Sequence, residues 1–460
     1  MLVGGTATVT ILLAVTLYTG EKGQVQWTPR SILVMAAVLR LLFLFRSPEL
    51  SDDLYRYLWD GLQILAGHNP YSLAPAEVRV HSESMANLIG YINHAEMITI
   101  YPPAAQLIFA AGASLGGGVL GMKALLTGMD LVTCYLIIQV LKALHLPPWR
   151  SVLYAWHPLS VLEIAASGHI DGGGILFLFV SISLMAACRA DCFSSGTSAK
   201  EFSRHMPRQT ILAMASGLTF AWAALVKFFP LIFLPVCLIC LPKRTRLPFC
   251  IGFSAGGIIP AAFFLPDLRK ELVTLGVYAR HWEFSGFLFK SLHRGVLSGD
   301  MVRGGISFLF FLSAAFSYKT FWSDKARLEQ AADLSRQSAA PHAKESRGFD
   351  IDASRQVFSL ALHAFYGIAM AFLLLSPTLY PWYALYLVGI SPFAAGPTGL
   401  VLAWSVFLSY QVLIPYTLLG LWVEGTWTPA LIWLAPISTF LLSVLGRRLI
   451  SGSAPRTRIP

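Results

Sequence analysis

The chain has 460 residues, of which 55% are hydrophobic and only 13% are charged, and its mean hydropathy is +0.62. This composition excludes a soluble globular protein and indicates an integral membrane protein surrounded by membrane lipids. The formal net charge of +10 does not point to nucleic acid as a partner, because the lysines and arginines are scattered among short loops and the C-terminal tail.

Continuous apolar runs recur from residues 2–18 and 31–45 near the start of the chain to residues 429–445 near its end. Continuous rather than alternating runs predict helices and not a barrel, because lipid offers backbone groups no hydrogen-bonding partner. At roughly 20 residues per crossing, with some shorter helices that are tilted or broken, the runs predict about 12–13 transmembrane helices. We therefore predict an all-α, polytopic membrane protein with residues 1–460 in a single domain.

Basic loops predict which side of the membrane each segment faces, because short loops rich in Lys and Arg stay in the cytoplasm. Residues 189–208 and the tail after residue 446 are basic in this way. Alternation places the Ser-, Ala- and charge-rich segment 319–355 on the same side, as a flexible cytoplasmic insert. The external face then receives a first loop at 47–100, with seven acids against two Lys or Arg, and a second loop at 266–303.

The first external loop contains the most distinctive pattern, SDDLYRYLWDG at residues 51–61. Asp53, Tyr57 and Asp60 recur at helical spacings, so they share one face of an amphipathic helix at the membrane surface. A carboxylate there can take the proton of an acceptor hydroxyl while a sugar is transferred. The alternative is a solvated acidic loop in which Asp52 or Asp53 caps the helix.

Further motifs follow this helix, GHNPY at residues 67–71 and YPP at 101–103. Together they resemble the first external loop of GT-C superfamily membrane mannosyltransferases, such as glycosylphosphatidylinositol mannosyltransferase one and the mycobacterial polyprenol-phosphate-mannose-dependent enzymes. The resemblance implies a GT-C-type fold, with the first external loop as the catalytic loop and Asp53, 14 residues before Gly67, as the base. It also implies supporting acids and substrate contacts at Asp52, Asp60, Arg56, Tyr57, Asn69 and Tyr101.

The apolar segment 101–116 opens with Pro102 and Pro103 and ends in a run of glycines. If every apolar run between the first external loop and residue 189 crossed the membrane, the basic residues 189–208 would lie on the external side. One of these runs therefore does not cross. We therefore expect this segment to be re-entrant or to lie on the membrane surface.

A second polar patch runs from WHPLS at residues 156–160 to SGHIDG at 167–172. It resembles a stretch of the same superfamily, although His157 replaces the usual Asn. His169 and Asp171 end a transmembrane helix on the external face, where polar groups are costly and usually functional. The alternative is a capped helix end. No spacing here demands a divalent metal, so we expect no metal or other cofactor; the alternative is a metal site built from His169, Asp171 and Asp53.

Lys227 lies between two apolar runs and precedes Pro230, which matches the Lys-x-x-Pro of the resembling families. It either snorkels to the interface or holds the phosphate of a lipid-linked donor.

Two later external segments add cations and aromatic rings. In residues 278–284, Arg280 could grip a departing phosphate and Trp282 could stack on a sugar, unless this is only surface charge. Residues 376–383, SPTLYPWY, resemble a Ser-Pro-x-x-x-Pro-Trp-Tyr signature of the same enzymes, and Tyr380 and Trp382 there form a substrate wall or anchor the chain at the interface.

These patterns predict a membrane glycosyltransferase that moves a hexose, mannose by resemblance, from a polyprenyl-phosphate donor to a lipid or glycan hydroxyl. The alternative is a multi-pass secondary transporter or a lipid flippase, but the polar groups gather at one face rather than at the midplane. No nucleotide-binding motif is found. We expect a bacterial inner membrane protein whose site faces the periplasm or exterior.

Overall fold

A computed structural model describes residues 2–24, 27–80, 82–194, 199–265, 267–293, 297–338, 343–394 and 396–452. Within these ranges the regular structure is helical, and the extended pairing is confined to isolated bridges from Phe284 and Ser285 to Thr378. The α-helices are α1 (Leu2–Glu21), α2 (Pro29–Leu44), α3 (Asp53–Leu65), α4 (Glu83–Gly90), α5 (Pro103–Ser114), α6 (Val119–Ala143), α7 (Val152–Ala155), α8 (Pro158–Ser160), α9 (Asp171–Ser194), α10 (Ala199–Val226), α11 (Leu234–Cys240), α12 (Lys243–Ala262), α13 (Leu268–His281), α14 (Phe287–His293), α15 (Gly299–Ser338), α16 (Ala343–Leu375), α17 (Leu385–Ile390), α18 (Pro397–Ser405), α19 (Leu413–Leu419) and α20 (Thr428–Gly452). Shorter helical turns are η1 (Pro75–Glu77), η2 (Pro148–Ser151), η3 (Val161–Ala166), η4 (Phe229–Phe233), η5 (Pro381–Ala384) and η6 (Val406–Val412).

Eight helical stretches in the described ranges are long and apolar enough to cross a membrane. The prediction of an all-α, polytopic membrane protein is therefore confirmed. Fewer helices than expected can cross alone, because several apolar runs fold into short or broken pieces such as α11 and η5. The eight stretches are Leu2–Glu21, Val119–Ala143, Asp171–Cys192, Met206–Val226, Gly299–Leu334, Asp352–Leu375, Pro397–Leu419 and Thr428–Leu445.

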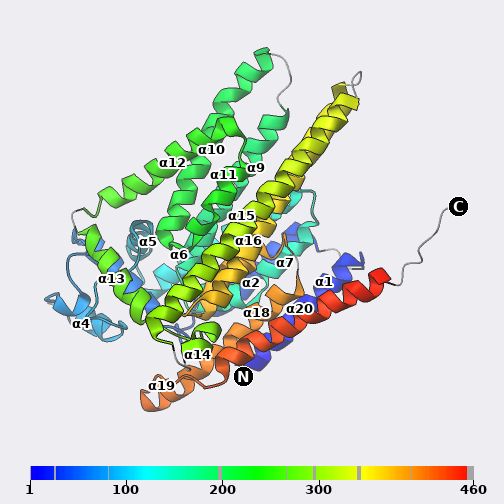
Figure 1. The fold of residues 1–460 in the computed structure, drawn as a ribbon. Helices are drawn as coiled ribbons and strands as arrows, with labels where there is room; N and C mark the ends of the chain where they lie inside the picture. Colours follow the sequence, from blue (N-terminus) through cyan, green and yellow to red (C-terminus); the bar gives the residue numbers. More distant parts are fainter. Residues whose placement is uncertain are drawn as a thin grey trace.

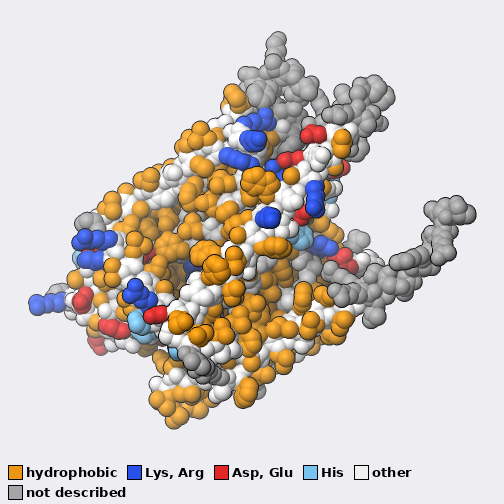
Figure 2. Space-filling model, viewed as in Figure 1, with side chains coloured by type: hydrophobic (Ala, Val, Ile, Leu, Met, Phe, Trp, Pro, Cys, Tyr) orange, Lys and Arg blue, Asp and Glu red, His pale blue; other side chains and the backbone are white. Residues whose placement is uncertain are grey.

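The long helices α9, α10, α12, α15 and α16 lie side by side and give the molecule an elongated bundle (Figure 1). Apolar side chains cover the flank of this bundle, whereas charged side chains gather toward its ends (Figure 2). This distribution is what a bilayer requires, since charges within hydrocarbon are costly.

The segment predicted to be re-entrant forms α5, which has 12 residues. A helix of that length rises about 18 Å, well short of the roughly 30 Å hydrocarbon core. It packs tightly on α3, because a Cβ added at Gly61 would collide with the backbone carbonyl of Phe109. The acidic first turn of α3 is thereby fixed relative to α5.

The predicted flexible insert at residues 319–355 is wrong in its conformation where the structure describes it. Helix α15 continues through Ser338 and α16 begins at Ala343, while residues 339–342 lie outside the described residues. The segment is rich in Ala and contains several Lys and Arg, which are strong helix formers, and α15 packs along α16.

Buried polar contacts tie the N-terminal helices together. The guanidinium Nε of Arg40 lies 2.5 Å from Asp130 Oδ2, with both side chains fully buried. The Tyr154 hydroxyl donates to the same carboxylate, at 2.5 Å. These contacts join α2, α6 and α7, which support the junction between η3 and α9.

Candidate active site

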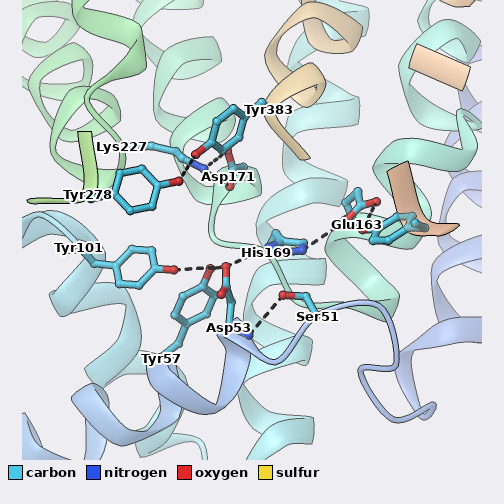
Figure 3. Close-up of polar contacts among 11 residues, drawn as sticks. Ser51, Asp53, Tyr57, Tyr101, Glu163, His169, Asp171, Lys227, Tyr278 and Tyr383 are labelled. Atoms are coloured by element: carbon cyan, nitrogen blue, oxygen red, sulfur yellow. Dashed lines mark hydrogen bonds and ion pairs between the residues drawn. The ribbon is translucent and has the colours of Figure 1, made fainter. Parts of the chain in front are cut away.

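The first turn of α3 meets the junction between η3 and α9 at one end of the bundle (Figure 3). Asp53 opens α3, and its Oδ2 accepts hydrogen bonds from the hydroxyls of Tyr57, at 3.5 Å, and Tyr101, at 3.3 Å. The Asp53 side chain is 29% exposed, although its neighbours are largely buried. The carboxylate is thus held by two phenols and still reachable from outside.

The environment of Asp53 makes it a stronger base than an ordinary carboxylate. Burial first, and then the nearby carboxyl of Asp52, raise the pKa of Asp53 from 3.8 to about 6. A group with that pKa remains mostly ionised at neutral pH and has a higher proton affinity than an unperturbed aspartate.

His169 lies directly behind Asp53. Its Nδ1 is 3.8 Å from Asp53 Oδ2, and its Nε2 is 3.3 Å from Glu163 Oε2. The Tyr410 hydroxyl donates to Glu163 at 2.8 Å. The imidazole also stacks on the Trp382 ring, with centroids 3.9 Å apart. Asp53, Glu163 and Trp382 therefore contact the histidine directly, and Tyr410 supports it through Glu163.

The local backbone explains why the histidine reaches this place. Gly168 has a φ of +77°, and a Cβ there would collide with the Leu54 side chain of α3. Only glycine combines this conformation with so close an approach. The preceding stretch η3 is π-helical, a form frequent at functional sites.

A buried ion pair flanks the Asp53–His169 contact. Lys227 Nζ lies 2.9 Å from both carboxylate oxygens of Asp171, and it also sits 4.5 Å from the centroid of the Tyr383 ring. Asp171 is only 1% exposed, whereas Lys227 is 26% exposed. The hydroxyls of Tyr278 and Tyr383 are 2.8 Å apart. One side of the lysine ammonium is therefore accessible.

A cavity of about 600 Å³ opens beside Asp53. Its wall combines carboxylates from the start of α3 with aromatic rings from the second external loop and η5. The residues important here are Asp52, Asp53, Trp282, Tyr380, Trp382 and Trp422. Tyr380 stacks on Trp382, with ring centroids 4.5 Å apart, so the aromatic wall is continuous.

The structure brings most of the predicted residues together in three groups. Direct contacts link Asp53, Tyr57, Tyr101 and His169, and separately Asp171 and Lys227. The cavity wall receives Asp52, Trp282, Tyr380 and Trp382.

Four predicted residues lie elsewhere. Asp60 pairs with Arg56, at 2.9 Å, and accepts from Gln106, so it is buried away from the cavity wall. Asn69 holds its own loop through the Phe264 carbonyl. Arg280 is exposed at the end of α13 and does not belong to the cavity wall.

Sequence reasoning did not assign Glu163, Tyr278, Tyr383 or Tyr410 to the site. For Glu163 a signal existed, since an acid within an apolar run is costly and usually functional. Tyr278 and Tyr383 lie within the two later segments already singled out, but tyrosines are common near membrane interfaces, so nothing distinguished these two or Tyr410 as site residues.

Among the described residues, no group of three or more His, Cys, Asp and Glu side chains could hold a metal ion. The expectation that the protein uses no metal or cofactor stays a prediction.

Neither a protein-family model nor a curated protein sequence matches the chain. Among solved structures it is similar to the archaeal oligosaccharyltransferase AglB from Archaeoglobus fulgidus, in complex with an inhibitory peptide and a dolichol-phosphate, with a TM-score of 0.40 and 13% identity. The match covers 90% of this chain and 55% of AglB, so the chain spans about half the length of that enzyme. A TM-score this low carries no conclusion about function.

Proposed function

We propose that the protein is a GT-C-type membrane glycosyltransferase. It moves a hexose, mannose by the resemblance of its loop motifs, from a polyprenyl-phosphate donor to a hydroxyl of a lipid-linked or glycan acceptor. The observation that carries the proposal is Asp53, a partly exposed carboxylate with a pKa of about 6 on the wall of an aromatic cavity in a polytopic membrane protein.

Asp53 acts as the general base. The acceptor hydroxyl gives its proton to the carboxylate while its oxygen attacks C1 of the donor sugar. The bond between C1 and the phosphate oxygen breaks, and the lipid phosphate leaves with the electron pair. Attack opposite the leaving group inverts the configuration at C1.

Lys227 contacts the departing phosphate. Two of its three N–H donors point at Asp171, which leaves one donor for a phosphate oxygen. A fixed cation stabilises the charge that grows on the leaving group. The pairing with Asp171 holds the ammonium in place before the donor arrives.

The aromatic wall binds the sugar. Trp282, Tyr380 and Trp382 offer flat faces beside the carboxylate, and such rings stack on the apolar face of a hexose.

The test is sugar transfer by the purified protein with radiolabelled polyprenyl-phosphate-mannose and a mixed lipid acceptor extract. A second arm uses the corresponding glucose donor. Wild type is compared with Asp53→Asn and with Asp267→Asn, a matched control for an acid of the second external loop that pairs with Lys270 outside the cavity wall.

We expect product from wild type and Asp267→Asn, and at least a hundredfold less from Asp53→Asn. Equal product from Asp53→Asn contradicts its role as base. No wild-type product from either donor, together with movement of labelled lipid between vesicle leaflets, favours the flippase alternative.

A further inference from the structure

Asp53, His169 and Glu163 form a polar series that leads from the cavity wall into the protein (Figure 3), and Tyr410, the next member, lies on the cavity wall again. Exposure falls from 29% for the Asp53 side chain to 1% for His169 and 0% for Glu163, and Tyr410 is also largely buried. The proposed reaction needs only the first member. The question is what the buried members do.

The imidazole has one nitrogen facing each carboxyl group. Nδ1 faces Asp53 at 3.8 Å and Nε2 faces Glu163 at 3.3 Å. A neutral ring carries one proton, so it can donate to only one of the two. The contact at the unprotonated ring nitrogen becomes a hydrogen bond only if the carboxyl group that faces this nitrogen is itself protonated and donates.

The degree of burial decides which of the two carboxyl groups is protonated and donates to the imidazole. Glu163 is fully buried, and its described contacts are a hydroxyl and an imidazole rather than a cation. Such a site favours the protonated carboxylic acid, whereas Asp53 is open to the cavity. A protonated Glu163 donates to Nε2, accepts from Tyr410 on its carbonyl oxygen, and leaves the ring proton on Nδ1.

The other charged groups around the ring do not reverse this choice. Asp171, at the start of α9, and Lys227, after α10, form an ion pair whose charges oppose each other. From η5 the ring meets Trp382, which fixes its plane without donating or accepting through the stack. The two carboxyl groups therefore set the tautomer.

We propose that Glu163 is a positioning residue that acts on Asp53 through His169. It fixes the Nδ1–H tautomer, so that this N–H faces Asp53 Oδ2 at 3.8 Å and donates to it once the side chains close to hydrogen-bond distance around bound substrate. The other carboxylate oxygen is held toward the acceptor hydroxyl. In enzymes with a catalytic triad a buried carboxylate fixes the imidazole by accepting its N–H, whereas here the protonated Glu163 fixes it by donating to the unprotonated nitrogen. The inference rests on the proposed function for its kinetic test only.

The kinetic test measures kcat/KM against pH for Glu163→Gln and Glu163→Met. The amide of Glu163→Gln can donate to Nε2 and accept from Tyr410, so we expect activity within about threefold of wild type at every pH. Glu163→Met keeps a side chain of similar volume but has no group that donates to His169 Nε2, so the Nδ1–H tautomer is no longer favoured. Asp53 then loses the imidazole donor and keeps only the hydroxyls of Tyr57 and Tyr101, so its pKa rises and the acidic limb moves up by about one pH unit.

A merely structural role predicts a different pattern. It lowers activity equally at all pH values, whereas we expect a loss of about tenfold at low pH that largely disappears on the alkaline plateau. Glu271→Met, at a buried carboxyl of α13 outside the polar series, is the control and should leave the acidic limb in place. An unshifted limb in Glu163→Met, or equal losses in Glu163→Met and Glu163→Gln, overturns the proposal.

A second test needs no transfer activity. In protein labelled with ¹³C,¹⁵N-histidine, the His169 signals are identified by their loss in His169→Gln, and their shifts report which nitrogen carries the proton. We expect an Nδ1–H ring in wild type and Glu163→Gln, and a mixture in Glu163→Met. A wild-type ring protonated at Nε2 overturns the inference, whatever the transfer assay shows about the proposed function.

Discussion

The two causes of the raised pKa of Asp53 can be separated by mutation. Burial is the larger and the Asp52 carboxyl is the next. A base works only when deprotonated, so we expect transfer to fall as the pH drops below about 6. Asp52→Asn removes the repulsion and should move this acidic limb to lower pH, by less than the whole shift because burial remains.

The measurement is the pH dependence of kcat/KM for wild type and Asp52→Asn. Asp267→Asn serves again as the control, since its carboxyl pairs with Lys270 rather than facing Asp53. If the acidic limb of kcat/KM lies at the same pH in Asp52→Asn as in wild type, the carboxyl groups of Asp52 and Asp53 do not interact.

The sequence predicts which single residues belong to the site better than it predicts which residues they contact. Helical spacing places Asp53, Tyr57 and Asp60 on one face of a helix, and the structure keeps Asp53 and Tyr57 in contact. Asp60 is instead covered by Gln106 of α5 and neutralised by Arg56. Which neighbour covers each part of a helix face depends on tertiary packing, which spacing does not contain.

The contact between α3 and α5 fixes Asp53 relative to Tyr101, because the two residues lie at the starts of these packed segments. A Cβ at Gly61 would overlap the Phe109 carbonyl, so Gly61→Ala must push the helices apart. We expect a loss of about 2 kcal/mol of stability and a clear fall in transfer activity.

Thermal unfolding and transfer assays check this prediction. The control is Gly128→Ala in α6, where an added Cβ meets nothing within 4 Å. This control should be unchanged or slightly more stable, since alanine favours helix by up to about 1 kcal/mol. Equal behaviour of the two variants would mean that α3 and α5 can separate without cost.

The sequence predicts the long apolar helices well, because their length and apolar character determine that they form. It predicts poorly the segments whose conformation depends on packing against a neighbour. The long spans such as α6 and α9 follow directly from hydropathy. The helical extensions of α15 and α16 do not, because polar composition alone does not separate a linker from two paired, solvated helices.

The whole molecule places its charged groups at two opposite ends of the apolar bundle (Figure 2). Helix α4 lies toward one end, together with α3, which packs on it, and the C-terminal end of α9 lies toward the other (Figure 1). The start of α12 belongs to the second end, because Arg244 donates to the Cys192 carbonyl of α9. Basic loops predict that this second end faces the cytoplasm.

Cysteine labelling on intact cells tests this orientation. Ser84, on α4, and Lys243, at the start of α12, are both exposed and belong to opposite ends. In a Cys250→Ala background, which removes the exposed native thiol, a membrane-impermeant maleimide should label Ser84→Cys directly and Lys243→Cys only after permeabilisation. The reverse pattern would put Asp53 on the cytoplasmic face, where soluble sugar nucleotides are available and a lipid-linked donor is no longer required. The choice of donor class therefore depends on this topology as much as on the site itself.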